Sequence, residues 1–169
     1  DRIRNYSPIE SYLYDCLGKW DGKDRIRALA RTVPTNNPHW EDWFYTWFLG
    51  MVDQWRGVYR KQYGNSTMPL LISKQGYNKS TFCRRLIPAE LSWGFTDNMI
   101  LSEKRQVLQA MSQFLLINLD EFNQISPQVQ QGFLKNLLQL PTVKIKPPYG
   151  SHVEEFPRLA SFIATSNMT

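Results

Sequence analysis

Cysteine and histidine are scarce in this chain of 169 residues. Two cysteines, Cys16 and Cys83, exclude a disulfide framework and a four-cysteine zinc site. The two histidines, His39 and His152, have no further ligands at metal-binding spacing around them, so we expect no structural metal. No run of about 18 apolar residues occurs, and no signal-peptide pattern is visible. These absences predict a cytoplasmic protein without a membrane span.

Charge of one sign is only mildly in excess. Lys and Arg number 20 against 15 Asp and Glu, a net charge of +5, which permits nucleic acid or a nucleotide as partner without requiring one. Apolar residues make up 42%, which excludes a disordered chain. The length fits one domain with or without a small appendage. Because the chain begins with Asp rather than Met, we expect it to be a piece of a larger protein.

Residues 1–66 are predicted to be helical. Ser7-Pro8 and Asn37-Pro38 are typical helix starts, since the first residue can cap and proline suits the first helical position. The longest of these helices carries a broad stripe of large residues at helical spacing: Trp40, Trp43, Phe44, Trp47, Phe48, Met51, Val52, Trp55 and Tyr59. This spacing favours a core role. A stacking platform for single-stranded bases and a partner-binding helical domain are the alternatives.

After residue 66 the pattern changes to short apolar runs that alternate with helices. Strands are predicted at 68–72, 94–97, 114–119 and 159–165. Strands separated by helices predict a parallel α/β sheet, with ligands at the carboxyl ends of its strands. We therefore divide the chain into a helical section, 1–66, and an α/β core, 67–169.

A phosphate-binding loop is predicted directly after the first strand. The letters S-K-Q-G-Y-N-K-S-T resemble the pattern G-x-x-x-x-G-K-[ST] between a strand and a helix. Backbone N–H groups of such a loop surround phosphate oxygens. Lys79 would supply positive charge to the terminal phosphates, and the Ser80 hydroxyl would complete a magnesium shell.

The loop departs from that pattern at both of its glycines. Ser73 and Asn78 stand in their places, and Gly76 is the one glycine that remains. Asn tolerates a left-handed backbone better than other non-glycine residues, so we expect Asn78 to hold the turn. An Asn78→Gly variant with much higher nucleotide affinity would indicate an impaired native loop.

Two further predicted strands end in polar residues. Asp120-Glu121 follows one of them, an arrangement in which the Asp holds magnesium and the Glu polarises the attacking water. Asn167 follows the last strand, where it can orient that water and sense the terminal phosphate. The intervals between Lys79, Asp120 and Asn167 each hold a helix and a crossover, as neighbouring parallel strands require. Solvated turn residues are the plain alternative at each strand end.

A basic segment at 144–152 is predicted to form a β-hairpin or projecting loop. Lys144, Lys146 and Tyr149 could hold a nucleic-acid backbone and stack a base, and a solvated surface hairpin is the alternative. Arg158 is expected to reach a phosphate across a subunit interface or to pair with one of the two glutamates that precede it.

Together these residues resemble the virulence-associated E family of P-loop ATPases. That family is similar to superfamily 3 helicases and to the helicase parts of primase–helicase proteins from phages and mobile elements. The resemblance is carried by K-W-D-G at 19–22, Q-G-Y-N-K-S-T-F at 75–82, F-T-D at 95–97, and the run K-P-P-Y-G, F-P-R and F-I-A-T-S-N between 146 and 167.

The resemblance implies a P-loop NTPase core of the AAA+ type, truncated at its C-terminus, that uses ATP and Mg²⁺. It implies a homo-oligomeric ring with an arginine supplied by a neighbour, acting on single-stranded or forked DNA. The residues it assigns are Gln75, Gly76, Tyr77, Asn78, Lys79, Ser80 and Thr81 for the nucleotide, Ser80 and Asp120 for magnesium, Glu121 and Asn167 for catalysis, and Lys144, Lys146 and Tyr149 for DNA.

The leading prediction is therefore an ATP-dependent DNA helicase or ATPase domain of a replication- or mobile-element-associated protein. Activity is expected of the full-length protein, because family residues that follow Asn167 lie beyond this chain. The alternative is a degenerate P-loop module that binds DNA or a protein partner without ATP turnover. Ser73 and Asn78 are the evidence for that alternative.

Overall fold

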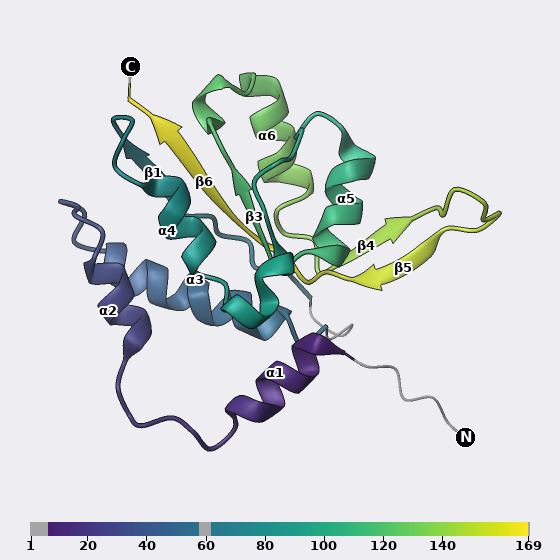
Figure 1. Cartoon of the computed structure of the whole chain (residues 1–169). Helices are drawn as coiled ribbons and strands as arrows, with labels where there is room; N and C mark the ends of the chain where they lie inside the picture. The colour runs from purple at the N-terminus through teal and green to yellow at the C-terminus, as the bar shows by residue number, and fades with distance from the viewer. Residues whose placement is uncertain (1–6, 58–61, 169) are drawn as a thin grey trace.

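Three helices precede a parallel sheet, and the helices that follow the sheet's strands lie on both of its faces (Figure 1). A computed structural model describes residues 7–57 and 62–168. None of the helices in these two stretches is both long enough and apolar enough to cross a membrane.

The first section forms α1 (Pro8–Cys16), α2 (Arg25–Arg31) and α3 (Trp40–Gln54), as its apolar spacing predicts. Ser7 caps α1, because its hydroxyl oxygen accepts a hydrogen bond from the Glu10 backbone N–H at 3.3 Å. α3 begins later than the Asn37-Pro38 signal predicts. The Asn37 side-chain oxygen accepts from the His39 backbone N–H at 2.9 Å and holds a turn before the helix.

The large residues of α3 are mostly core, as their spacing favours. Phe44, Trp47 and Met51 are buried. Trp43 is the exception: it is 61% exposed and stacks on His39, with ring centroids 5.2 Å apart. The core interpretation is therefore wrong for Trp43, while Tyr59 lies outside the described residues.

Four strands form the main sheet: β1 (Leu70–Ser73), β2 (Phe95–Thr96), β3 (Leu116–Leu119) and β6 (Ser161–Asn167). Their order is β1-β6-β3-β2, and every neighbouring pair is parallel. The prediction of a parallel α/β sheet is confirmed, with strand bounds shifted by about two residues.

The register brings three strand ends to the same edge of the sheet. Ser73 of β1 lies opposite Asn167 of β6, and Leu119 of β3 lies opposite Ala164. Residues that follow β1, β3 and β6 therefore emerge beside one another, where ligands of parallel sheets bind.

Helices cover the two faces of this sheet: α4 (Lys79–Arg85) one face, and α5 (Lys104–Gln113) and α6 (Pro127–Asn136) the other (Figure 1). Two short 3₁₀ helices, η1 (Ala89–Gly94) and η2 (Phe122–Gln124), complete the connections. The buried strands supply both cores in alternation, as Ile163 of β6 belongs to the core beneath α3 and α4, and Phe162 to the core beneath α5 and α6.

The helical section and the sheet share one hydrophobic core. Phe44 and Trp47 of α3 belong to the same buried cluster as Leu71 of β1 and Cys83 of α4. Phe44 also lies 6.1 Å from the Phe82 ring of α4, centroid to centroid. The N-terminal helices thereby support the strand and helix that flank the glycine-containing loop.

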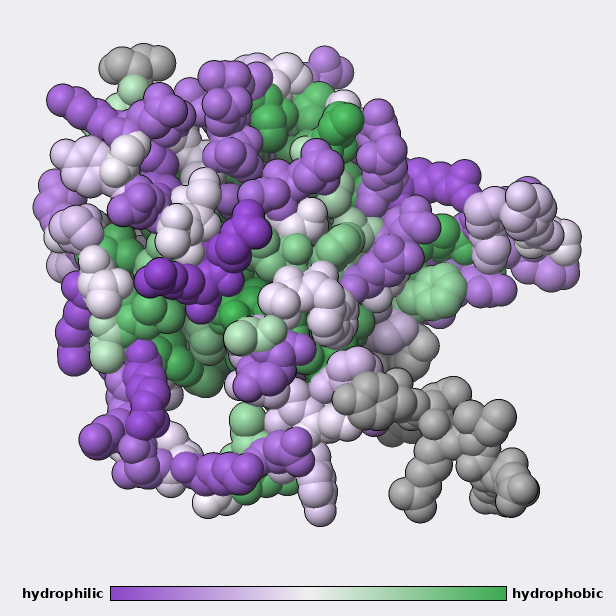
Figure 2. Space-filling model, in the orientation of Figure 1, coloured by the Kyte–Doolittle hydropathy of each residue, from purple (hydrophilic) through white to green (hydrophobic). Residues whose placement is uncertain are grey.

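The basic segment forms the predicted β-hairpin. Its strands β4 (Thr142–Ile145) and β5 (Glu154–Pro157) pair antiparallel, and the hairpin projects from the body of the molecule (Figure 1). Its outer end is covered by hydrophilic and neutral residues rather than apolar ones (Figure 2).

Arg158 corrects a sequence-based expectation. Its side chain is 1% exposed, so it reaches neither a phosphate nor the preceding glutamates. The guanidinium donates instead to four backbone carbonyls, those of Leu138, Leu140, Ala160 and Asn65. Burial lowers the pKa of Arg158 to about 9, and the four carbonyl oxygens oppose this by favouring the charged form. The buried Arg158 side chain therefore joins segments that are distant in sequence by hydrogen bonds.

We expect Arg158→Lys to lower the free energy of unfolding by about 2–4 kcal/mol. The compact ammonium of lysine cannot donate to all four carbonyl oxygens that the planar guanidinium reaches, so some buried acceptors lose their hydrogen bonds. Urea denaturation measures the difference. Arg84→Lys is the control, since the Arg84 side chain is 65% exposed, and a change within about 0.5 kcal/mol is expected there. Equal losses in the two variants would contradict the interior role.

Candidate functional site

A cleft of about 310 Å³ lies at the carboxyl ends of β1, β3 and β6. It brings together the ten residues that sequence reasoning assigned to nucleotide, magnesium and catalysis. They are Gln75, Gly76, Tyr77, Asn78, Lys79, Ser80, Thr81, Asp120, Glu121 and Asn167. Three segments far apart in sequence contribute, so the cleft exists only in the folded chain.

The loop between β1 and α4 forms one wall and depends on left-handed backbone. Gly76 has φ +94, and a Cβ added there would meet nothing within 4 Å, so the dihedral alone requires glycine. Asn78, which precedes α4, has φ 60 and ψ 32. The residue standing in place of the pattern's second glycine thus adopts a conformation that Asn tolerates, as expected.

The Lys79 ammonium connects the ends of β1 and β6. Its Nζ donates to Ser73 Oγ at 2.8 Å and to the Ser73 carbonyl oxygen at 3.1 Å. It also donates to the Lys74 carbonyl oxygen at 3.2 Å and to Asn167 Oδ1 at 3.1 Å. The first and third sequence motifs are therefore in direct contact through one charged group.

Asp120 faces the cleft from the end of β3. Its Oδ1 accepts hydrogen bonds from Thr165 Oγ1 at 2.8 Å and from the Glu121 backbone N–H at 3.0 Å. Glu121 adopts φ 50 and is exposed, which leaves its carboxylate at the open side of the cleft. Thr165 was not singled out from sequence, although its position two residues before Asn167 on β6 is a usable signal.

The charges in the cleft are one ammonium and two carboxylates. Burial raises the pKa of the Cys83 thiol to about 12, and the Asp120 charge adds to this shift, so α4 packs within electrostatic reach of Asp120. Across residues 7–57 and 62–168, no group of three or more His, Cys, Asp or Glu side chains could hold a metal. Magnesium needs no such group, because it is bound by one or two carboxylates together with phosphates and water. The Asp120 carboxylate and the Ser80 hydroxyl suit that mode.

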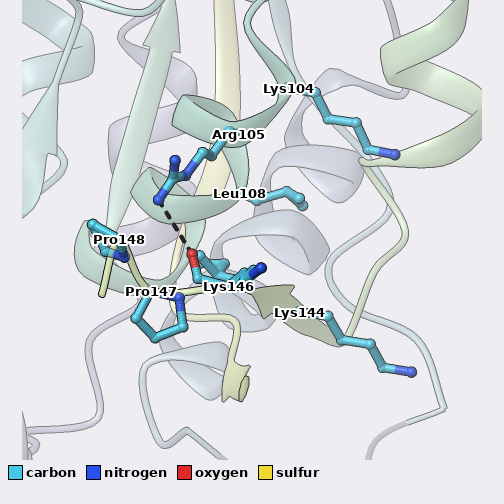
Figure 3. A pocket seen from close by; sticks show the side chains of 8 residues that line it. Lys104, Arg105, Leu108, Lys144, Lys146, Pro147 and Pro148 are labelled. Atoms are coloured by element: carbon cyan, nitrogen blue, oxygen red, sulfur yellow. Dashed lines mark hydrogen bonds between the residues drawn. The ribbon is translucent and has the colours of Figure 1, made fainter. Parts of the chain in front are cut away.

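A second, basic groove of about 480 Å³ lies between α5 and the hairpin. Lys104, Arg105 and Leu108 line it from α5, and Lys144, Ile145, Lys146, Pro147 and Pro148 line it from the hairpin. The Arg105 Nη2 donates to the Lys146 carbonyl oxygen at 3.2 Å, which joins the two elements (Figure 3). The side chains of Lys104, from α5, and Lys144, from the hairpin, extend in the same direction (Figure 3).

The tip residue Tyr149 does not line this groove and is fully exposed. Sequence reasoning found Lys144 and Lys146 but missed Lys104 and Arg105. Adjacent basic residues near a helix start carry no local signal that a hairpin about 40 residues later will pack beside them.

Comparison with protein-family models matches residues 13–169 to a family described as virulence-associated protein E-like domain. The match spans the helical section as well as the sheet, and it includes every residue that lines the cleft. A search of the curated proteins finds no match.

Asn78→Ala should lower the free energy of unfolding by about 1–2 kcal/mol, because Ala is strained in the left-handed region. Asn78→Gly should change it by less than about 1 kcal/mol, since glycine adopts that backbone freely and loses only chain entropy. Thermal or urea denaturation of both variants measures the difference. Equal effects of Ala and Gly would contradict a left-handed Asn78.

Proposed function

Because the chain belongs to the virulence-associated protein E-like domain family, we propose that it is a P-loop nucleoside-triphosphatase core of the AAA+ type. In this proposal the cleft binds Mg²⁺–ATP, and the full-length protein couples hydrolysis to movement on DNA as a helicase. The observation that carries the proposal is the convergence of three polar strand ends on one cleft beside a left-handed, glycine-containing loop.

The loop and Lys79 would bind and orient the phosphates. Residues 76–80 line the cleft with left-handed backbone at Gly76 and Asn78, and N–H groups of such a loop would be the donors that phosphate oxygens require. The Lys79 ammonium already sits among oxygen atoms at hydrogen-bond distance. A phosphate oxygen would replace some of these partners and gain a charge-assisted hydrogen bond.

Of the two carboxylates at the end of β3, one would bind magnesium and the other would activate the attacking water. Asp120, oriented by Thr165, would hold magnesium together with the Ser80 hydroxyl. Glu121 is exposed at the adjoining position, where it would accept a proton from the attacking water. Asn167 contacts Lys79 and would orient that water and report the presence of the terminal phosphate.

One observation favours the alternative of a module that binds without turnover. The Ser73 hydroxyl, where the pattern has glycine, lies 2.8 Å from Lys79 Nζ and competes with phosphate for the ammonium. Asn78, the other departure, argues less strongly for this alternative, because it already holds the left-handed turn. ATP turnover by the full-length protein distinguishes the two functions.

The basic groove would hold the DNA backbone. Lysines from α5 and from the hairpin line one hollow, and a nucleic-acid strand laid in it would meet ammonium groups on both walls. The exposed Tyr149 ring at the hairpin tip would stack on a base of the same strand. A ring of several copies, with hairpins directed at a common strand, is the assembly this use of the hairpin suits.

Lys79→Ala in the full-length protein should abolish ATP binding and unwinding, because it removes the cation that meets the phosphates. Glu121→Gln should keep ATP affinity within a few-fold and reduce turnover by about 10²–10⁴, the usual effect of losing a general base. Equilibrium binding and phosphate release measure these two effects. Lys135→Ala on α6, away from the cleft, is the control. Turnover at the wild-type rate by the Lys79→Ala variant would contradict the assignment of the cleft as the site of ATP hydrolysis.

Replacing Lys144 and Lys146 with Gln should weaken single-stranded DNA binding at low salt and reduce its salt dependence. Two lost phosphate contacts make the negative slope of log K against log salt shallower by about 1.4, at roughly 0.7 per contact. Binding titrations of the full-length protein at several salt concentrations give this slope. Replacing Lys23 and Lys135 with Gln, two exposed lysines that do not line the groove, is the charge-matched control. An unchanged slope would exclude the groove as the DNA site.

A further inference from the structure

Four polar residues meet inside the molecule at the place where the hairpin leaves its body. They are Gln54 at the end of α3, Asn65 in the segment that leads to β1, Arg158 directly after β5, and Ser161 at the start of β6. Asn65 is half-buried and the other three are buried. We call these four residues the polar cluster. β5 leads here into the amino end of β6, so the cluster lies at the opposite end of that strand from the cleft (Figure 1).

Arg158 holds both strands of the hairpin at their base. Its guanidinium donates to the carbonyl oxygens of Leu138 and Leu140, in the segment that leads into β4. Its backbone N–H donates to the carbonyl oxygen of Pro141, the residue before β4, at 3.2 Å. All of these acceptors belong to the main chain, so the bonds fix the backbone itself, whereas a side-chain acceptor could rotate away.

The helical section is bonded to the same cluster. The Arg158 Nη2 donates to the Asn65 carbonyl oxygen at 3.1 Å, and the Asn65 Nδ2 donates to Ser161 Oγ at 3.0 Å. Gln54 Oε1 accepts from the Asn65 backbone N–H at 2.9 Å, while its Nε2 donates to the Ala160 carbonyl oxygen at 2.6 Å. One hydrogen-bond network therefore joins α3, the hairpin base and the start of β6. Buried networks whose polar groups are paired specify a single arrangement of the segments that they join.

Space beside the cluster is closed at Gly64. Its N–H donates to the Gln139 carbonyl oxygen at 2.9 Å. A Cβ added to Gly64 would meet Arg158 Nη1 at 2.5 Å and would lie closer still to the Leu140 carbonyl oxygen. Gly64 does not have left-handed backbone, so the close approach of the hairpin base, rather than a dihedral angle, requires glycine here.

The basic groove depends on where the hairpin lies. One wall carries Lys104 and Arg105 of α5, and the other carries Lys144 and Lys146 of the hairpin. Because the hairpin projects from the body, a small displacement at its base would move its lysines relative to those of α5 (Figure 1). The spacing of the four cationic groups, which a nucleic-acid backbone would meet, is therefore sensitive to the position of the base.

We propose that the helical section sets the position of the hairpin through the polar cluster, so that Gln54, Gly64 and Asn65 act as positioning residues for the basic groove. The helical section thereby takes part in DNA binding without touching DNA. The proposal rests on the proposed function for the ligand, single-stranded DNA, whereas the effect on the hairpin can be measured without any ligand. Mg²⁺–ATP binding should not depend on the cluster, which lies away from the cleft.

Gly64→Ala tests the proposal, because the added methyl group pushes residues 62–66 away from the hairpin base. Amide hydrogen exchange of the full-length protein, followed by mass spectrometry, should show hairpin amides in 142–157 exchanging at least about tenfold faster than in the wild type, and still faster than amides of β3. Gly132→Ala is the matched control, since a Cβ there meets nothing within 4 Å, and it should leave hairpin exchange within about twofold.

Binding measurements on the same variants test the functional part. Gly64→Ala should weaken single-stranded DNA binding at low salt by at least about threefold and leave Mg²⁺–ATP affinity within about twofold. Gln54→Met is a second variant, chosen because it keeps the side-chain length but removes the hydrogen bonds to Asn65 and Ala160. It should change exchange and DNA binding in the same directions, and it decides the matter if Gly64→Ala does not fold.

The remaining outcomes contradict the proposal in distinguishable ways. A smaller acceleration of hairpin exchange, or hairpin rates that merge with those of β3, would show global destabilisation only and overturn the positioning role. Similar losses of DNA and ATP affinity would overturn it as well. DNA binding that Gly64→Ala leaves unchanged while the Lys144 and Lys146 replacements weaken it would overturn this inference alone. Binding that neither change affects would overturn the proposed DNA groove together with this inference.

Discussion

The position of the Lys79 ammonium is the constraint on which the candidate site depends. It is bonded to the last residue of β1 and to the last residue of β6, and these two residues are also paired in the parallel register. A shift of one residue between the strands would turn every β6 side chain to the other face and remove Asn167 from Lys79. The geometry of the candidate site therefore requires this register between β1 and β6.

That register is maintained by side-chain packing as well as by hydrogen bonds between the strands. β1 has only four residues and lies at the edge of the sheet, so its own ladder is short. The core shared by α3, α4 and β1 holds it from one side, and Arg158 joins Ala160, which precedes β6, to Leu140 in the segment that follows α6. The helical section thus stabilises the strand that leads into the loop.

Local signals in the sequence predicted most of the elements, because caps, prolines and apolar spacing act over a few residues. They also predicted which residues meet in the cleft, since a parallel sheet brings its strand ends to one edge. Arg158 was misassigned because charged residues are almost never fully buried, and three of its four carbonyl partners come from segments distant in sequence. The groove beside Lys104 and the polar cluster around Asn65 were missed for the same reason: each is made by contacts between segments that no local pattern connects.

Backbone strain gives independent support to the location of the site. In the part of the chain that the structure describes, two non-glycine residues adopt positive φ, Asn78 and Glu121, and both line the cleft. Asn adopts this conformation more readily than other non-glycine residues, whereas for Glu it costs about 1–2 kcal/mol, and such conformations cluster at functional sites. Asn78 turns the loop into α4, and Glu121 turns the chain out of β3 directly after Asp120. The two left-handed residues belong to separate segments and both line the cleft, which is more readily explained by selection for a binding geometry than by folding stability.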